Sequence, residues 1–119
     1  MAAATKQLND IRTQFDDAYA IAESTSRIAL AGPVATMQEI RRATDKLETP
    51  KCMENAKTLT VNGMDAMING FIAFMAEQSD SQVGSYIQSS SDYFMQSIDE
   101  IDRIAACRPF CQDKRAATP

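Results

Sequence analysis

The chain has 119 residues, a typical length for one domain, so we expect a single domain over residues 1–119. Its composition, 45% hydrophobic and 24% charged, is ordinary for a globular protein and excludes intrinsic disorder. Histidine is absent, which excludes Ser-His and Cys-His catalytic couples and imidazole metal ligands. Four glycines and four prolines are too few for the turns of an all-β sandwich or barrel.

The net charge is −4, from 12 Lys and Arg against 16 Asp and Glu. Residues 58–107 contain seven acidic side chains and one basic side chain, Arg103. Because nucleic-acid backbones need clustered Lys and Arg, we expect no nucleic-acid binding. The most apolar stretch, residues 61–76, is shorter than the ~20 residues of a spanning helix and contains Asn62, Asp65 and Asn69. We therefore expect no transmembrane segment.

The predicted elements begin with a helix over residues 9–31, where apolar residues recur at alternating steps of three and four. Gly32 suits the left-handed position that ends a helix, and Pro33 can begin the next helix. The second helix, over residues 33–47, is then about half as long as the others. Its predicted buried face comprises Val34, Met37, Ile40, Thr44 and Leu47.

The third predicted helix covers residues 50–78, with Thr49 as its N-cap and Pro50 at the first helical position. Ser79 and Gln82 match a capping box, so a fourth helix follows over residues 80–107. Its predicted inward side chains are Val83, Ile87, Ser90, Phe94, Ile98, Ile101 and Ala105. Residues 108–119 are polar, and we expect a loose C-terminal tail there. Four amphipathic helices with short connections predict an all-α fold, an up-down four-helix bundle.

Two of the three cysteines are placed almost symmetrically about the predicted turn. Cys52 lies 27 residues before Ser79, and Cys107 lies 28 residues after it. Because helices rise ~1.5 Å per residue, an antiparallel pair turning near Ser79 would bring these two thiols to the same height. We predict a disulfide between Cys52 and Cys107, with Cys111 as the alternative partner of Cys52 and three buried reduced thiols as the other alternative. A disulfide would indicate a periplasmic or secreted protein, and reduced thiols would fit the cytoplasm.

The cysteines also allow a chemical interpretation. Cys107 and Cys111 form a CxxxC pair, which differs from the CxxC of thioredoxin-like enzymes. The three cysteines with Asp113 could hold zinc, although structural zinc sites favour paired CxxC knuckles. We expect no metal and no cofactor, and we keep thiol redox chemistry or metal binding as an alternative function.

Two sets of residues, centred on the third helix, are candidates for binding. A methionine and phenylalanine stripe could line an apolar groove for a partner protein or a small ligand, although such a stripe is also typical of a core. The groove candidates are Met64, Met67, Phe71 and Phe74, with Phe94 from the fourth helix. A flank of small residues would let another helix approach closely, within the chain or in a homodimer. These small residues are Gly63, Ala66, Gly70 and Ala73.

The pattern as a whole predicts a protein that is not an enzyme, because it has no histidine, no nucleophile motif and no glycine-rich phosphate loop. We expect a helical-bundle binding or scaffolding protein, exported and linked by a disulfide. Its partner would be a protein or a small apolar ligand. Transport of a small apolar ligand, and thiol or metal chemistry at the C-terminal cysteines, are the alternatives.

Overall fold

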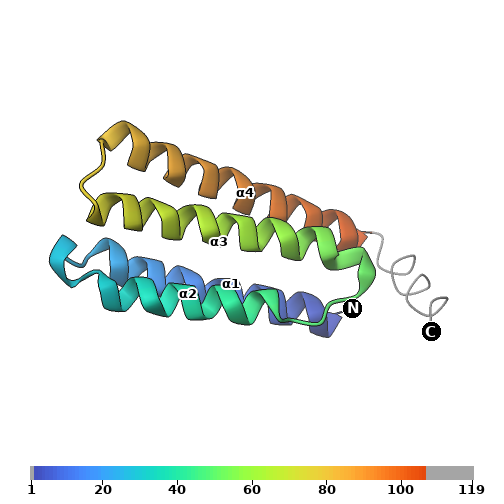
Figure 1. The fold of residues 1–119 in the computed structure, drawn as a ribbon. Coiled ribbons are helices and arrows are strands. Elements are labelled where there is room, and N and C mark those ends of the chain that lie inside the picture. The colour runs from blue at the N-terminus through green and yellow to red at the C-terminus, as the bar shows by residue number, and fades with distance from the viewer. Residues whose placement is uncertain (1, 107–119) are drawn as a thin grey trace.

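The structure is a computed structural model that describes residues 2–106. Four α-helices run alternately up and down (Figure 1). They are α1 (Ala2–Glu23), α2 (Ala31–Asp45), α3 (Glu54–Met75) and α4 (Asp80–Ala106), with the 3₁₀ turns η1 (Arg27–Ala29) before α2 and η2 (Lys51–Met53) before α3. The predicted all-α class and up-down bundle with a short second helix are confirmed. Cys107 and the predicted tail over residues 108–119, which includes Cys111, lie outside the described residues.

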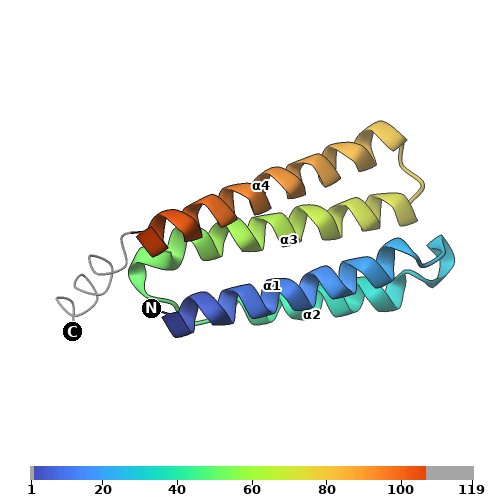
Figure 2. The same cartoon turned by 180° about the vertical axis from the view of Figure 1, so that it is seen from behind.

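The four helices are not packed symmetrically. α3 is central, with α2 packed on one side and α4 packed closely on the other. α1 packs mainly on α2. Figure 2, the view from behind, shows α4 beyond α3 on the side away from α1 and α2. Within residues 2–106, the backbones of α1 and α4 are therefore not close neighbours.

The buried core divides into two clusters along the bundle. The cluster toward η1 contains Phe15, Ala18, Ala22, Leu30, Val34, Met37, Met64, Met67 and Ile68. The cluster toward η2 contains Ala4, Leu8, Ile11, Met53, Ala56, Ile101 and Ile104. Ile40 packs against both clusters. Burial of these apolar stripes is the main force that holds the four helices together.

The first helix differs from its predicted range at both ends: α1 begins at Ala2 and not at residue 9, and the prediction of a helix to residue 31 is wrong because α1 ends at Glu23. The Ser24 hydroxyl donates to the carbonyl oxygens of Ala20 and Ile21, and Thr25 also donates to Ile21. Hydroxyl groups that bond back to the last turn compete with the helix backbone and favour its end. Gly32 then lies in the first turn of α2 without a positive φ, so its predicted left-handed role is also wrong.

The turn between α3 and α4 is built by local hydrogen bonds on both sides. Ser79 accepts the backbone N–H of Gln82 on its hydroxyl oxygen at 3.2 Å, as the capping motif predicts. On the α3 side, Glu77 adopts a left-handed φ of 59°. Its N–H donates to Phe74 O at 3.1 Å, and the N–H of Gln78 donates to Ala73 O at 3.0 Å. This is the Schellman arrangement, which usually has glycine at the position of Glu77.

Candidate functional site

An elongated apolar groove lies between α1 and α4. It consists of two adjoining depressions that share Tyr19 and Ile87 as lining residues. The depression toward the α3–α4 turn has a volume of about 200 Å³, and the one toward the middle of the bundle has about 380 Å³. The first is lined by Tyr19, Ala22, Glu23, Thr25, Leu30, Gly70, Phe71, Phe74, Val83 and Ile87. The second is lined by Phe15, Asp16, Tyr19, Met67, Ile87, Ser91, Phe94, Met95 and Ile98.

The groove exists because α4 packs against α3 through small residues and leaves α1 at a distance. A Cβ atom on Gly63 would lie 2.8 Å from the Phe94 ring, so the ring occupies the space that any larger residue would need. At Gly70, a Cβ atom would lie 3.4 Å from the side chains of Tyr86 and Ile87. The Ser90 hydroxyl donates to Gly63 O at 2.8 Å across the same interface. This close approach draws α4 toward α3 and away from α1.

The α4 wall of the groove presents apolar side chains to solvent. Ile87 is 41% exposed, Ile98 is 42% exposed and Met95 is 61% exposed. The prediction that Ile87 and Ile98 point into the core is therefore wrong. The face of α4 that contacts α3 is centred instead on Ser90 and Ser97, both fully buried. Large apolar side chains aligned at a solvent-facing groove are typical of an interaction site.

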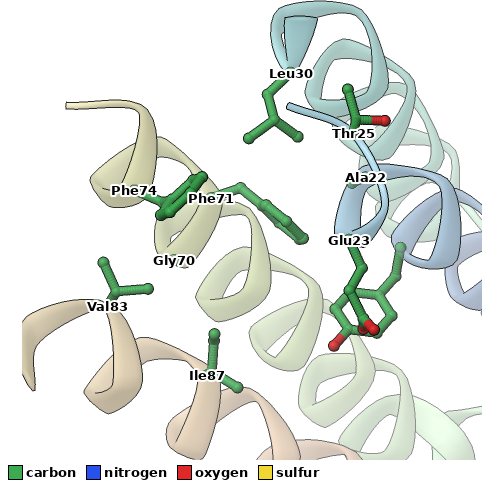
Figure 3. Close-up of a pocket in the computed structure, with 10 residues that line it drawn as sticks. Ala22, Glu23, Thr25, Leu30, Gly70, Phe71, Phe74, Val83 and Ile87 are labelled. Carbon is green, nitrogen blue, oxygen red and sulfur yellow. The ribbon is translucent and has the colours of Figure 1, made fainter. Parts of the chain in front are cut away.

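Aromatic rings form the floor of the groove and connect three helices. The ring centroids of Phe15 on α1 and Phe94 on α4 are 6.0 Å apart, and those of Tyr19 on α1 and Phe71 on α3 are 5.8 Å apart. Figure 3 shows Phe71 and Phe74 projecting from α3 beside Val83 and Ile87 of α4. These rings are held in tilted contacts that favour a defined, preformed surface.

The α1 wall of the groove carries acidic groups. Glu23 lies beside the Tyr19 hydroxyl, and their hydrogen bond is the main reason that the pKa of Tyr19 is raised. Asp16 is exposed, but the surrounding protein removes part of its hydration, and this burial raises the pKa of its carboxyl group. The charge of Arg12 lowers the pKa of Asp16, and that of Asp17 raises it further.

One end of the groove already holds a cation. The guanidinium carbon of Arg27 lies 4.2 Å from the ring centroid of Phe74, and Arg27 Nε donates to Phe74 O at 2.9 Å. Arg27 also lies 3.6 Å from the carboxylate of Glu77. A guanidinium over an aromatic face is stabilised by the ring quadrupole.

The predicted groove residues are distributed between the core and the groove. Phe71 and Phe74 line the depression near the turn, whereas Met67 and Phe94 line the central depression. Met64 is fully buried in the core and lines neither depression.

The predicted small residues lie on α3. Gly63 and Gly70 face α4, and Ala66 and Ala73 are buried beside them. Tyr19 of α1 and Ile98 of α4 also line the groove, although neither was predicted to do so. For Ile98 the signal was an apolar stripe on α4 that is wider than one helix contact requires.

The polar residues on the opposite side of α3 have a structural role. Arg41 of α2 donates from Nε to Asp65 Oδ1 at 2.8 Å and from Nη2 to Asp65 Oδ2 at 3.2 Å. This bidentate contact raises the pKa of Arg41, chiefly through the hydrogen bond to Asp65. It joins α2 to α3 away from the groove.

Of the three cysteines, the structure describes Cys52. Cys52 lies in η2 and packs against the cluster that contains Ile101 and Ile104 of α4. The predicted partners Cys107 and Cys111 lie outside the described residues, so the pairing stays a prediction. Among residues 2–106, no three Cys, Asp or Glu side chains gather closely enough to hold a metal ion.

The groove and fold together define an all-α four-helix bundle with an open apolar groove beside its closest helix pair. No family model matches the chain, and no curated protein or solved structure matches it. Within residues 2–106, no helix is long and apolar enough to cross a membrane.

Proposed function

We propose that the protein is a non-enzymatic binding module that engages apolar groups of a partner in the α1–α4 groove. The observation that carries this proposal is the solvent exposure of Ile87, Met95 and Ile98 along the α4 wall. Exposing these side chains costs free energy in the isolated chain, because each could bury most of its apolar surface against a partner. The aromatic floor beneath them supplies a rigid surface for that contact.

The groove is elongated rather than compact. Val83 and Ile98 mark its two ends on α4, and the 15 helical steps from one to the other span about 22 Å. This length supports a partner that is itself extended, such as a helix, over a compact small ligand. Native mass spectrometry of the purified protein tests the alternative of a small apolar ligand, since a bound small molecule would be detected directly.

A solvatochromic neutral dye such as Nile red tests whether the groove binds apolar groups. We expect dye fluorescence to rise with the unmodified protein and to fall severalfold in Ile87→Ser. The matched control is Ile72→Ser, because Ile72 is 43% exposed, like Ile87, but lines a different depression beside α2 and α3. Equal dye binding by both variants would overturn the proposal.

We also propose that the protein is exported and that Cys52 is linked to Cys107, with Cys111 as the alternative partner. Two observations support the link. Cys52 packs against the apolar cluster that includes Ile101 and Ile104 of α4, and α4 continues to Ala106, the residue before Cys107. A link here would close a loop of more than 50 residues, worth roughly 4 kcal/mol in the chain-entropy model. Peptide mapping by mass spectrometry without reduction would identify the pair, and three free thiols would overturn it.

A further inference from the structure

Given the proposed binding function, on which this assignment rests, we infer that the occupant of the α1–α4 groove is a basic amphipathic helix of about four turns. Such a helix would place its apolar stripe on Ile87, Phe94 and Ile98 and its lysines and arginines against the two walls. Amphipathic helices bind hydrophobic grooves through apolar anchors at i, i+3, i+4 and i+7 spacing, which fits a groove of this length.

The acidic charge of the chain is concentrated on the two helices that form the groove. Residues 13–23 of α1 and 80–99 of α4 contain six acidic side chains and no lysine or arginine. These acidic residues are Asp16, Asp17, Glu23, Asp80, Asp92 and Asp99. In contrast, α2 has two acidic and two basic residues, and α3 has two acidic residues and one basic residue. Over their whole lengths α1 and α4 contain nine acidic and three basic side chains, so the excess of negative charge lies on the two helices that form the groove walls.

Two of the three basic residues of α1 and α4, Lys6 and Arg103, lie toward the opposite end of the groove, and the third, Arg12, lies one turn before Asp16. Lys6 forms an ion pair with Asp10 at 2.7 Å, and Arg103 forms an ion pair with Glu100 in the last turns of α4. The antiparallel course of α1 and α4 places these pairs near the η2 end of the bundle (Figure 1). Between Asp16 and Glu23 on α1 and between Asp80 and Asp99 on α4, the two walls carry no basic residue. The nearest cations, Arg12 and Arg27, each lie beside an acidic group, Asp16 and Glu77 respectively.

The acidic side chains are positioned to reach a partner in the groove. Asp16 and Glu23 line it directly from α1. On α4, Asp99 follows Met95 by four residues and Asp80 precedes Val83 by three, spacings that place each near a groove-lining residue on the helix surface. Charges at the margin of an apolar contact favour partners of the opposite sign and reject partners of the same sign.

Two other occupants fit the groove less well. A second copy of the chain would bring an equally acidic pair of helices against the same walls. The C-terminal residues 108–119 are basic, but they offer one large apolar side chain, Phe110, for a groove with several apolar positions. A basic helix from another protein satisfies both the apolar stripe and the acidic walls.

The test uses three synthetic peptides with one pattern of leucines at helical spacing and with lysine, glutamine or glutamate at every other position. Their binding to the whole chain is measured by fluorescence anisotropy at low salt. We expect the leucine–lysine peptide to bind most tightly, the leucine–glutamine peptide to bind at least fivefold more weakly, and the leucine–glutamate peptide not to bind. Higher salt should weaken the binding of the leucine–lysine peptide most, because salt screens the interactions between exposed charges.

Two matched pairs of variants locate the binding. Ile87→Ser should weaken the binding of the leucine–lysine peptide about five- to tenfold, the value expected for one apolar anchor. Ile72→Ser should leave this binding unchanged. The double variant Asp16→Asn/Glu23→Gln should weaken it about three- to tenfold. Its control, Glu39→Gln/Glu48→Gln, removes the same charge from exposed residues outside the groove and should have little effect. Circular dichroism confirms that each variant is folded.

The outcomes separate this inference from the proposed function. If the protein bound the lysine and glutamine peptides with equal affinity, and Ile87→Ser abolished the binding of both, the groove would remain a binding site. The inference that the partner is basic would then be overturned. Equal weakening by the two charge variants would also overturn it, because the attraction would then be nonspecific. Failure of every peptide together with failure of the neutral dye would overturn the proposed function itself. A concentration-dependent dimer that Ile87→Ser abolishes would make a second copy the occupant.

Discussion

The hydroxyl oxygens of Thr60 on α3 and Ser97 on α4 lie 2.6 Å apart, and both residues are fully buried. Both hydroxyls also reach the carbonyl oxygen of Ala56, Thr60 at 2.9 Å and Ser97 at 3.3 Å. One turn of α3 and one turn of α4 are thus joined by a small buried polar network. Such a network stabilises one register of the helix pair, because any shift would leave buried hydroxyl groups without partners.

We expect Thr60→Val to reduce the free energy of unfolding by about 1–2 kcal/mol, because valine keeps the shape of threonine but removes the hydroxyl that meets Ser97. Urea denaturation followed by circular dichroism measures the change. The control is Thr58→Val, an exposed substitution on the same helix. In Thr60→Val/Ser97→Ala the loss should be smaller than the sum of the two single losses, since both residues share one network. Strict additivity would show that the hydroxyls do not interact.

Gly63→Ala should destabilise the protein by about 1–3 kcal/mol, because the new methyl group would meet the Phe94 ring in a packed interface. This cost exceeds the gain of about 1 kcal/mol that alanine brings to a helix. Gly84→Ala is the control: a Cβ atom there has nothing within 4 Å, so that variant should gain stability. Thermal unfolding compares the two.

The steric origin of the Gly63 effect can be tested by shortening the neighbouring side chain. Phe94→Leu is expected to cost less stability in the Gly63→Ala background than in the unmodified protein, because leucine leaves room for the methyl group. An equal cost in both backgrounds would contradict a direct contact between the two positions.

Glu77→Gly should raise the free energy of unfolding by about 0.5–1 kcal/mol, because glycine adopts the left-handed conformation of this position without a steric penalty. The lost ion pair with Arg27 is exposed and contributes little. Gln78→Gly, the neighbouring substitution at a position without positive φ, should instead destabilise the protein. Chemical denaturation measures both variants, and a destabilised Glu77→Gly would indicate that Glu77 has a stronger role than its contacts suggest.

Stability should depend on pH through Glu100. Its carboxylate accepts hydrogen bonds from Arg103 on the same helix and from Asn55 of α3, the latter at 3.0 Å, and the bond to Arg103 is the main reason that its pKa is lowered. A lowered folded-state pKa stabilises the protein above the ordinary glutamate pKa of about 4.3, and this contribution disappears as the pH falls through the folded-state value.

We therefore expect Glu100→Gln to destabilise the protein by about 0.5–1 kcal/mol at neutral pH and to have much less effect in strong acid. Denaturation curves at several pH values measure the difference. Asp99→Asn, which removes a charge at the exposed neighbouring position, is the control and should cost less stability at neutral pH than Glu100→Gln. A destabilisation by Glu100→Gln that is the same at all pH values would show that the charge of Glu100 is not involved.

Much of the helical architecture could be predicted from local patterns. The predicted range of α4 agrees with the structure within one residue, because Ser79 supplies a cap that acts through its nearest neighbours. The predicted face of α2 also matches the buried residues, as Met37 illustrates. The predicted start of the third helix at Thr49 and Pro50 is wrong, because α3 begins at Glu54 after the 3₁₀ turn η2. The end of α1 was predicted from Gly32 and Pro33 and is wrong, because the hydroxyls of Ser24 and Thr25 bond back to the last turn and end the helix before those residues.

The groove could not be predicted from the same patterns. Ile87 and Ile98 share one face of α4 with Ser90 and Phe94 at helical spacing, and that spacing alone indicates a single inward stripe. Which part of a wide stripe becomes buried depends on the direction from which α3 approaches. Gly63 and Gly70 allow that approach to be close, so the interface centres on Ser90 and Ser97 and leaves the isoleucines at its margin.

The amino-acid order by itself determined the helical class, the number of helices, the cap at Ser79 and the acidic excess of residues 58–107, because each depends on residues near in sequence. Only the tertiary structure decided that α4 packs closely on α3, that Thr60 forms a hydrogen bond with Ser97, and that α1 and α4 face each other across an apolar groove. Those relationships depend on how side chains from separate helices share volume, and periodicity along one helix carries no information about that.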